Sequence, residues 1–264
     1  MRGIRQTFGA LALLGLVACG GTGSLEGPAM PGSPPAPSAP PTSGASVHPL
    51  AGSWTDTNGR GQLFVSPDGE VYSLLRGTDT TRLLRGTLTA SNGLVPSGSF
   101  DVVDMQVPGA IEHWSVSGSY QPQSQLLLSA DGRGPLLSDV YDAHSHGVSA
   151  VAALAGRYEV TIFGNAPSVI SYLATLSEDG GVDLVGWQAG QEQCHIRGAL
   201  TAASPTITVL NASLVASGAG CQFPDGTNVK GLAQYDPDNN VLILFGMSES
   251  GDVALLLYAS PINA

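Results

Sequence analysis

The residues best suited to chemistry lie in one short polar stretch near the middle of the chain. It reads Asp139-Val140-Tyr141-Asp142-Ala143-His144-Ser145-His146. Two imidazoles two residues apart on a strand or loop can reach one ion, and nearby carboxylates can complete a site for zinc, copper or nickel. His144 and His146 are therefore candidate metal ligands. The simpler interpretation, which we favour, is a solvated polar connector between two halves of the chain that holds no metal.

The rest of the sequence offers no recognisable active-site motif. It contains no nucleophile elbow, no zinc-binding HExxH helix, no phosphate-binding glycine loop and no CxxC pair. Serines are abundant, but none stands in a recognisable catalytic context. The sequence therefore predicts a protein that is not an enzyme, with no catalytic residues and no cofactor.

The first residues of the chain form an export signal. Arg2 and Arg5 precede an apolar run, residues 8–17, and small residues follow it. A basic start, a short apolar segment and small residues before a cleavage point are typical of a secretory signal peptide. The run of about ten residues is too short for a bilayer core, which needs about twenty. We therefore exclude this segment from the folded protein.

The end of this signal, Leu16-Val17-Ala18-Cys19, resembles the lipobox of bacterial lipoproteins. The resemblance implies that residues 1–18 are removed and that Cys19 receives a diacylglycerol thioether and becomes the acylated N-terminus. Gly20, rather than Asp, follows it. By resemblance to enterobacterial sorting rules this implies a lipid anchor in the cell outer membrane, with the folded part periplasmic or surface-exposed. The alternative is an ordinary signal peptide that carries a cysteine near its end by chance.

Residues 19–48 consist almost wholly of Gly, Pro, Ala, Ser and Thr. The prolines are Pro28, Pro31, Pro34, Pro35, Pro37, Pro40 and Pro41. Such a segment cannot bury enough apolar surface to offset the entropy lost on ordering, so we predict a disordered or polyproline-like linker. We interpret it as a spacer between the lipid anchor and the folded region.

The charge balance excludes some partners. The chain has 10 basic and 21 acidic residues, and removal of Arg2 and Arg5 with the signal leaves 8 basic residues and a net charge of −13. Nucleic acids and anionic lipid surfaces require positive patches, so neither is expected as a partner. The membrane is expected as a partner only through the N-terminal lipid.

Cys194 and Cys221 are the two cysteines that remain beyond Cys19. In an exported chain, two such thiols are predicted to form a disulfide. No CxxC motif or paired histidine spacing accompanies them, so a redox or metal role is the weaker interpretation.

Four short segments recur in the same order in the two halves of the chain. The pairs are residues 50–54 with 154–158, 66–71 with 177–182, 85–90 with 197–202, and 120–128 with 235–244. Internal similarity of this kind indicates repeated supersecondary units. We therefore interpret the folded region as two copies of one unit of about 100 residues.

Within each copy the pattern is that of short strands and tight turns. Asp68-Gly69 separates two apolar runs and predicts a hairpin, because glycine accepts the positive φ of the turn. From residue 113 to 120 apolar and polar side chains alternate, which predicts one buried and one wet face. Between Phe100 and Val107 the apolar phase shifts, which we interpret as a β-bulge. The Ala-rich stretch 148–154 predicts a short helical turn between the copies.

About seven or eight strands fit into each copy, and such a chain closes most easily as an up-and-down barrel, which removes exposed strand edges. The predicted fold class is all-β: two tandem antiparallel up-and-down β-barrel-like units, residues 49–147 and 148–264, after a disordered tether. A β-sandwich and one intertwined barrel of about sixteen strands are the alternatives.

The Leu-x-Gly-x-Trp opening at residues 50–54 resembles the first strand of lipocalin-type and other calycin-like barrels, in which the tryptophan plugs the closed end. Residues 154–158 repeat the pattern with Tyr158 in place of tryptophan. The resemblance covers the start of each unit and implies barrel topology.

Together these observations predict a non-enzymatic outer-membrane lipoprotein that acts as a binding module. Its partner would be a small apolar ligand inside a barrel, or an envelope or extracellular protein at the loop ends. Residues 107–112 and 218–225 are the candidate recognition loops. The alternative is a structural, envelope-maintenance lipoprotein with filled barrels, and a metal protein or enzyme that uses His144 and His146 is the third hypothesis.

Overall fold

The computed structural model describes residues 47–107, 109–147, 150–164, 171–188, 190–218, 220–221 and 223–262. The signal segment, Cys19 and the linker up to residue 46 lie outside the described residues, so the lipid anchor and the spacer stay predictions. The described residues belong to one compact unit, Ala45–Ala264.

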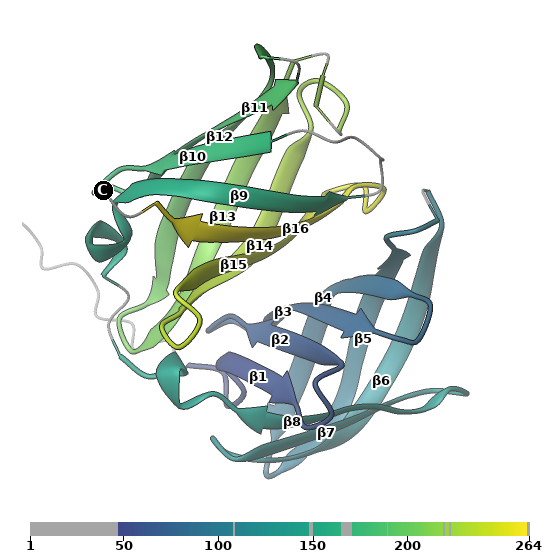
Figure 1. Cartoon of the computed structure of the whole chain (residues 1–264). Coiled ribbons are helices and arrows are strands. Elements are labelled where there is room, and N and C mark those ends of the chain that lie inside the picture. The colour runs from purple at the N-terminus through teal and green to yellow at the C-terminus, as the bar shows by residue number, and fades with distance from the viewer. Residues whose placement is uncertain are drawn as a thin grey trace, which may run out of the picture. The chain divides into compact units, whose positions relative to one another are not determined.

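In these ranges, sixteen antiparallel strands form two closed barrels of eight strands each (Figure 1). Barrel 1 contains β1 (Gly52–Asp56), β2 (Gly61–Val65), β3 (Glu70–Arg76), β4 (Thr81–Ser91), β5 (Leu94–Asp104), β6 (Ile111–Gln121), β7 (Gln125–Ala130) and β8 (Gly134–Tyr141). Barrel 2 contains β9 (Gly156–Gly164), β10 (Ser171–Leu176), β11 (Gly181–Gln188), β12 (Gln191–Ser204), β13 (Ile207–Ser217), β14 (Asn228–Asp236), β15 (Val241–Ser248) and β16 (Ala254–Pro261). Strands adjacent in sequence pair with each other, and the first strand of each barrel pairs with the last. This confirms the predicted all-β fold of two up-and-down barrels and excludes a sandwich and a single sixteen-stranded barrel.

Both barrels begin in the same way. In barrel 1 the Trp54 indole Nε1 donates a hydrogen bond to the Leu50 carbonyl oxygen at 2.8 Å, and both side chains are fully buried. In barrel 2 the Tyr158 hydroxyl donates to the Leu154 carbonyl oxygen at 2.5 Å. In each copy the aromatic side chain therefore donates a hydrogen bond to the carbonyl oxygen of the residue four positions earlier. Tyrosine can take the place of tryptophan because both side chains carry a hydrogen-bond donor.

The first hairpin turn is also repeated. The Ser66 hydroxyl donates to Asp68 in barrel 1, and the Ser177 hydroxyl donates to Asp179 in barrel 2. The glycine that follows each aspartate has φ +89°, which only glycine adopts readily. The turns at residues 66–70 and 177–181 are thus the same structure, as the sequence repeat predicted.

Two short 3-10 helices lie between the barrels in the sequence. They are η1 (Ala143–Ser145) and η2 (Val151–Leu154). The second of these confirms the helical turn predicted from the Ala-rich stretch.

Alternate side chains fill the interior of barrel 1. They include Trp54, Leu63, Val65, Leu84, Phe100, Trp114, Leu126 and Leu128, which belong to one cluster of buried residues. A separate cluster fills barrel 2 and includes Tyr158, Leu184, Ile196, Leu210, Leu214 and Leu255.

A third apolar cluster explains the phase shift in the sequence near residue 102. It joins outward-facing residues of the two barrels, including Phe64, Tyr72, Leu83, Val103, Leu232, Phe245 and Leu256. Val102 packs inside barrel 1, and its neighbour Val103 packs in this third cluster, so both faces of β5 are buried there. The predicted β-bulge is wrong, because β4 and β5 stay in register from Arg82–Asp104 to Thr89–Ser97.

Aromatic stacking and hydrogen bonds strengthen this contact between the barrels. The rings of Phe64 and Phe245 stack with centroids 4.7 Å apart and planes 16° apart. The Arg85 Nη1 donates to the Ser248 carbonyl oxygen at 2.6 Å. The two barrels therefore share a packed apolar interface.

Within the described ranges, no helix has the length and apolar character needed to cross a membrane.

Candidate functional site

The two candidate metal ligands lie in the connector after β8, but each has a different neighbour. The His144 Nδ1 lies 3.1 Å from Asp142 Oδ1, and the His146 ring packs on the Tyr141 ring with centroids 5.2 Å apart. Among the described residues, no group of three or more His, Cys, Asp or Glu side chains is placed to hold a metal ion. The stretch also joins the barrels, because Thr208 Oγ1 donates to the His144 carbonyl oxygen at 2.7 Å. These contacts are those of a polar connector.

The predicted disulfide is present. Cys194 and Cys221 are bonded and join β12 to the loop between β13 and β14. Cys194 is fully buried in the barrel 2 cluster, where Phe223 and Val253 also pack. At this end of barrel 2, the disulfide therefore ties the β13–β14 loop to β12.

The interior of barrel 2 has little free space. A cavity of about 30 Å³ lies among Tyr158, Leu184, Leu200, Leu244 and other apolar residues. Within the described residues, this cavity is much smaller than the volumes of about 300–1,000 Å³ that typically hold a small-molecule ligand.

A pocket of about 620 Å³ opens at one end of barrel 1. We call it the mouth of barrel 1. Its lining residues are Gly59, Arg60, Leu75, Arg76, Gly77, Thr78, Thr80, Arg82, Trp114, Arg133, Gly134, Pro135 and Leu136. They come from the loops β1–β2, β3–β4 and β7–β8 and from the strand ends beside them. The volume is in the range typical of small-molecule sites.

Positive charge is concentrated at this mouth. Four of the lining residues are arginines, whereas the whole chain after residue 18 has only 8 basic residues. None of the described lining residues is acidic. Half of the basic residues of this acidic chain therefore line a single pocket.

Trp114 forms part of the apolar lining of the mouth, with Leu75, Pro135 and Leu136. Trp114 is 5% exposed, and the guanidinium carbons of Arg82 and Arg133 lie 5.5 Å and 4.7 Å from the centroid of its ring. Cation–π contacts at these distances hold a guanidinium group in place while its edge remains free for hydrogen bonds. The two arginines are thus oriented by the same ring.

Carboxylates outside the lining hold three of the arginines. Arg133 Nη2 donates to Glu112 Oε2 at 2.7 Å, and the Trp114 Nε1 donates to the same oxygen at 2.9 Å. The hydrogen bond from Trp114, together with the charges of Arg133 and Arg82, lowers the pKa of Glu112. Arg82 lies 3.9 Å from Asp104.

Arg60 is anchored more deeply, by a buried carboxylate. Its Nε and Nη2 lie 3.2 Å and 3.3 Å from the two oxygens of Asp56, whose side chain is fully buried. Burial favours protonation of Asp56, but the hydrogen bonds from Arg60 and from the backbone amides of Arg60 and Asn58 outweigh it and lower the pKa. Asp56 is therefore ionised at neutral pH and fixes Arg60 at the rim.

Arg76 differs from the other three arginines. Its Nη2 donates to the Tyr258 hydroxyl of barrel 2 at 2.9 Å, and this partner is neutral. A guanidinium group has five N–H donors, and the hydrogen bonds described above use two from Arg60 and one each from Arg76 and Arg133. The four arginines that line the mouth therefore keep several N–H donors that these contacts do not use.

The predicted recognition loops lie partly outside the described residues, at Pro108, Ala219 and Gln222. Residues 107–112 cover the end of the β5–β6 loop and the start of β6, where Glu112 holds Arg133 and Trp114. Residues 218–225 carry Cys221, which is bonded to Cys194 of β12. Among the described residues, the first of the two loops thus ends beside the mouth of barrel 1.

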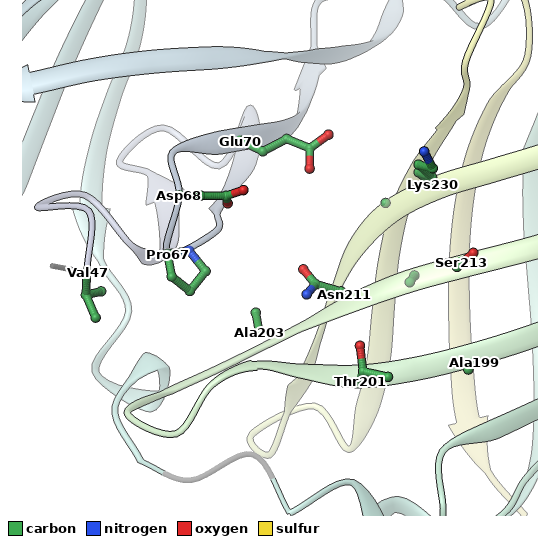
Figure 2. Close-up of a pocket in the computed structure, with 12 residues that line it drawn as sticks. Val47, Pro67, Asp68, Glu70, Ala199, Thr201, Ala203, Asn211, Ser213 and Lys230 are labelled. Carbon is green, nitrogen blue, oxygen red and sulfur yellow. The ribbon is translucent and has the colours of Figure 1, made fainter. Parts of the chain in front are cut away.

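A second pocket, of about 470 Å³, lies between the β2–β3 hairpin of barrel 1 and strands β12 to β14 of barrel 2. Figure 2 shows Pro67, Asp68 and Glu70 on one side, with Thr201 and Asn211 on the other. Its charged groups are of both signs and bind within the chain: Lys230 Nζ lies 2.7 Å from Glu249, and Glu70 accepts from the Tyr72 hydroxyl at 3.1 Å. This pocket therefore lacks the single sign of charge that distinguishes the mouth of barrel 1.

The arginine cluster is not recognisable in the sequence. Arg60, Arg76, Arg82 and Arg133 are spread over more than seventy residues and belong to no motif. The signal that the sequence offered is their distribution, because five of the seven arginines after residue 18 lie in the first copy of the repeat. Comparison with known proteins finds no matching family model, no matching curated protein and no matching solved structure.

Proposed function

We propose that this protein is a lipid-anchored binding module that takes an anionic small molecule at the mouth of barrel 1. The observation that carries the proposal is the pocket lined by four arginines and Trp114, with no acidic side chain among its described lining residues. Arginine forms paired hydrogen bonds with carboxylate, sulfate and phosphate groups. The ligand class is therefore an organic anion with two or more such groups.

The arrangement of the arginines supports a specific site over a diffuse positive surface. Arg82 and Arg133 are held by Trp114, and Arg60 is held by Asp56, so little side-chain entropy is lost when an anion binds. The rest of the chain is strongly acidic and repels anions at other positions. Binding is thus directed to one place.

Barrel 2 has a different role in this proposal. The disulfide ties its β13–β14 loop to β12, and it packs on barrel 1 through the shared apolar cluster. We propose that it supports barrel 1, while the linker of residues 19–48 and the lipid on Cys19 hold both barrels at the outer membrane. The anchor is tested by labelled palmitate, which should be incorporated in the intact protein and lost in Cys19→Ser.

The binding test uses the mature chain and naphthalene-1,3,6-trisulfonate, an anion whose charge is constant with pH. Calorimetric titration at pH 6 and low salt should show one site. Arg82→Gln/Arg133→Gln should weaken binding by roughly tenfold or more, since each charge-assisted hydrogen bond contributes about 1.5–3 kcal/mol.

A matched control removes the same charge elsewhere. Arg157→Gln/Arg197→Gln takes two arginines from barrel 2, where Arg197 pairs with Asp183 on the surface. This variant should bind as the unmodified protein does. Equal loss in the two double variants would show an effect of net charge and would refute the site.

A structural, envelope-maintenance role is the second candidate, and the packed interiors favour it. It predicts that the trisulfonate does not bind at all. The same titration therefore separates the two functions.

A further inference from the structure

Asp139 is a buried carboxylate for which the fold provides no obvious partner. It lies on β8 with no exposed surface, and neither of its oxygens has a hydrogen-bond partner in the described part of the chain. Val140 beside it is 49% exposed, so the Asp139 side chain points into barrel 1. A charge in such a place is costly unless it is neutralised or compensated.

The strand register places Asp139 beside the residue that anchors the mouth. In the closing pair of strands, Asp139 is opposite Asp56, and Asp56 holds Arg60 through two hydrogen bonds. Arg60 lines the mouth, as do Pro135 and Leu136 on the same strand as Asp139. A short path therefore leads from Asp139 through Asp56 and Arg60 to the proposed anion site.

We propose that Asp139 couples anion binding at the mouth of barrel 1 to the uptake of one proton from solvent. The anion binds most tightly when the Asp139 carboxyl is neutral, and it binds more weakly when that carboxyl is ionised. This inference rests on the proposed function and adds a regulation to the same site.

The physical cause is the number of ionised carboxylates next to Arg60. With Asp139 neutral, Arg60 is held by the single charge of Asp56, and its remaining field acts on the ligand. When Asp139 ionises, a second negative charge lies beside Asp56, reduces that field and repels the anion. By reciprocity, the bound anion favours the protonated form of Asp139.

The groups around Asp139 set the ionisation of its carboxyl near neutral pH. Burial, together with the charge of Asp56, raises the pKa of Asp139 to about 7, and Arg60 opposes the rise. On the other flank, β7 contributes Leu126, which is apolar and fully buried. Asp56 and Arg60 are thus the charged groups that act on it.

The test measures binding of naphthalene-1,3,6-trisulfonate to the mature chain at pH 5.5 and pH 8.5. We expect binding to weaken roughly tenfold at the higher pH, a size typical of coupled sites. Asp139→Asn should bind equally at the two pH values, because the amide has no charge to gain. Asp183→Asn, which removes an exposed carboxylate from barrel 2, should keep the full pH dependence.

A second measurement does not need a variant. Calorimetry of the unmodified protein at pH 7, in two buffers of different ionisation enthalpy, should show a fraction of a proton taken up with each anion bound. No uptake, or binding of equal strength at both pH values, would overturn the coupling and leave the proposed function intact. Absence of binding at both pH values would overturn the function and the coupling together, and a pH dependence that persists in Asp139→Asn would assign it to another group.

Discussion

Replacing Asp139 with asparagine should stabilise the protein most at alkaline pH. The ordinary pKa of the carboxyl is 3.8 and burial beside Asp56 raises it to about 7, so the folded state binds this proton more tightly than the unfolded state does. For an acid with a raised pKa, stability falls as pH rises from about 4 to 7 and is constant above that. Each pKa unit corresponds to about 1.36 kcal/mol, so the full penalty at pH 8 is about 4 kcal/mol.

About 3 kcal/mol of this penalty develops between pH 5 and pH 8, because part of it is already present at pH 5. In a folded region of this size, that corresponds to a fall in Tm of roughly 6–12 °C. Urea unfolding followed by tryptophan fluorescence at the two pH values should show this fall in the free energy of unfolding for the unmodified protein. Asp139→Asn should show no such fall.

The control is Asp79→Asn, which removes an exposed carboxylate from the β3–β4 loop. It should lose stability between pH 5 and pH 8 as the unmodified protein does. A protein whose stability is equal at the two pH values, or an Asp139→Asn variant that retains the same fall, would refute the reasoning.

Three further predictions concern the two-barrel body. Removing the disulfide with Cys194→Ser/Cys221→Ser should lower the free energy of unfolding by about 3 kcal/mol in the chain-entropy model, measured by urea unfolding without reductant; an unchanged midpoint would contradict the brace. Phe64→Ala should cost about 3 kcal/mol or more and split one calorimetric transition into two, since it removes the ring stacked on Phe245; a single unshifted transition would show that the barrels do not depend on this contact. Gly86→Ala and Gly198→Ala, at matching positions of the repeat, should each destabilise by about 1–3 kcal/mol, because an added Cβ would lie 1.8 Å and 1.9 Å from the carbonyl oxygens of Ser99 and Ser213. Normal stability in both would show that the strands can separate at no cost.

The barrel architecture was predictable because its signals are local. The hairpin at Asp68-Gly69 and the opening of each copy depend on residues within a few positions of one another, and the repeat doubles each signal. Trp54 and Tyr158 were expected in corresponding places, and both donate a hydrogen bond four residues back. Short-range chemistry of this kind can be recognised in a single sequence.

The phase shift near residue 102 has a cause that lies outside barrel 1. The alternation of buried and exposed residues assumes that one face of a strand meets water. Val103 breaks the pattern because its outward face is covered by barrel 2. Sequence alone does not say which outward faces pack on a second barrel.

The candidate site was hidden for a similar reason. Arg60 and Arg133 come from two different turns and Arg82 from the start of β4, and only closure of the barrel brings them together. Asp56 and Asp139 lie 83 positions apart and meet through the pairing of the first and last strands. Whether residues so far apart in the sequence meet depends on the pairing register of the strands. Neither composition nor motifs specify that register.

The most direct measurement is the response of the tryptophan indole signals to an anion. The chain has three tryptophans, Trp54, Trp114 and Trp187, so a two-dimensional ¹⁵N–¹H spectrum has three indole peaks. Titration with naphthalene-1,3,6-trisulfonate at pH 6 should shift the Trp114 peak, because its Nε1 donates to the carboxylate that also holds Arg133. The Trp187 peak, from barrel 2, should stay in place. A Trp114 peak that does not move, or one that moves no more than that of Trp187, would contradict an anion site at the mouth of barrel 1.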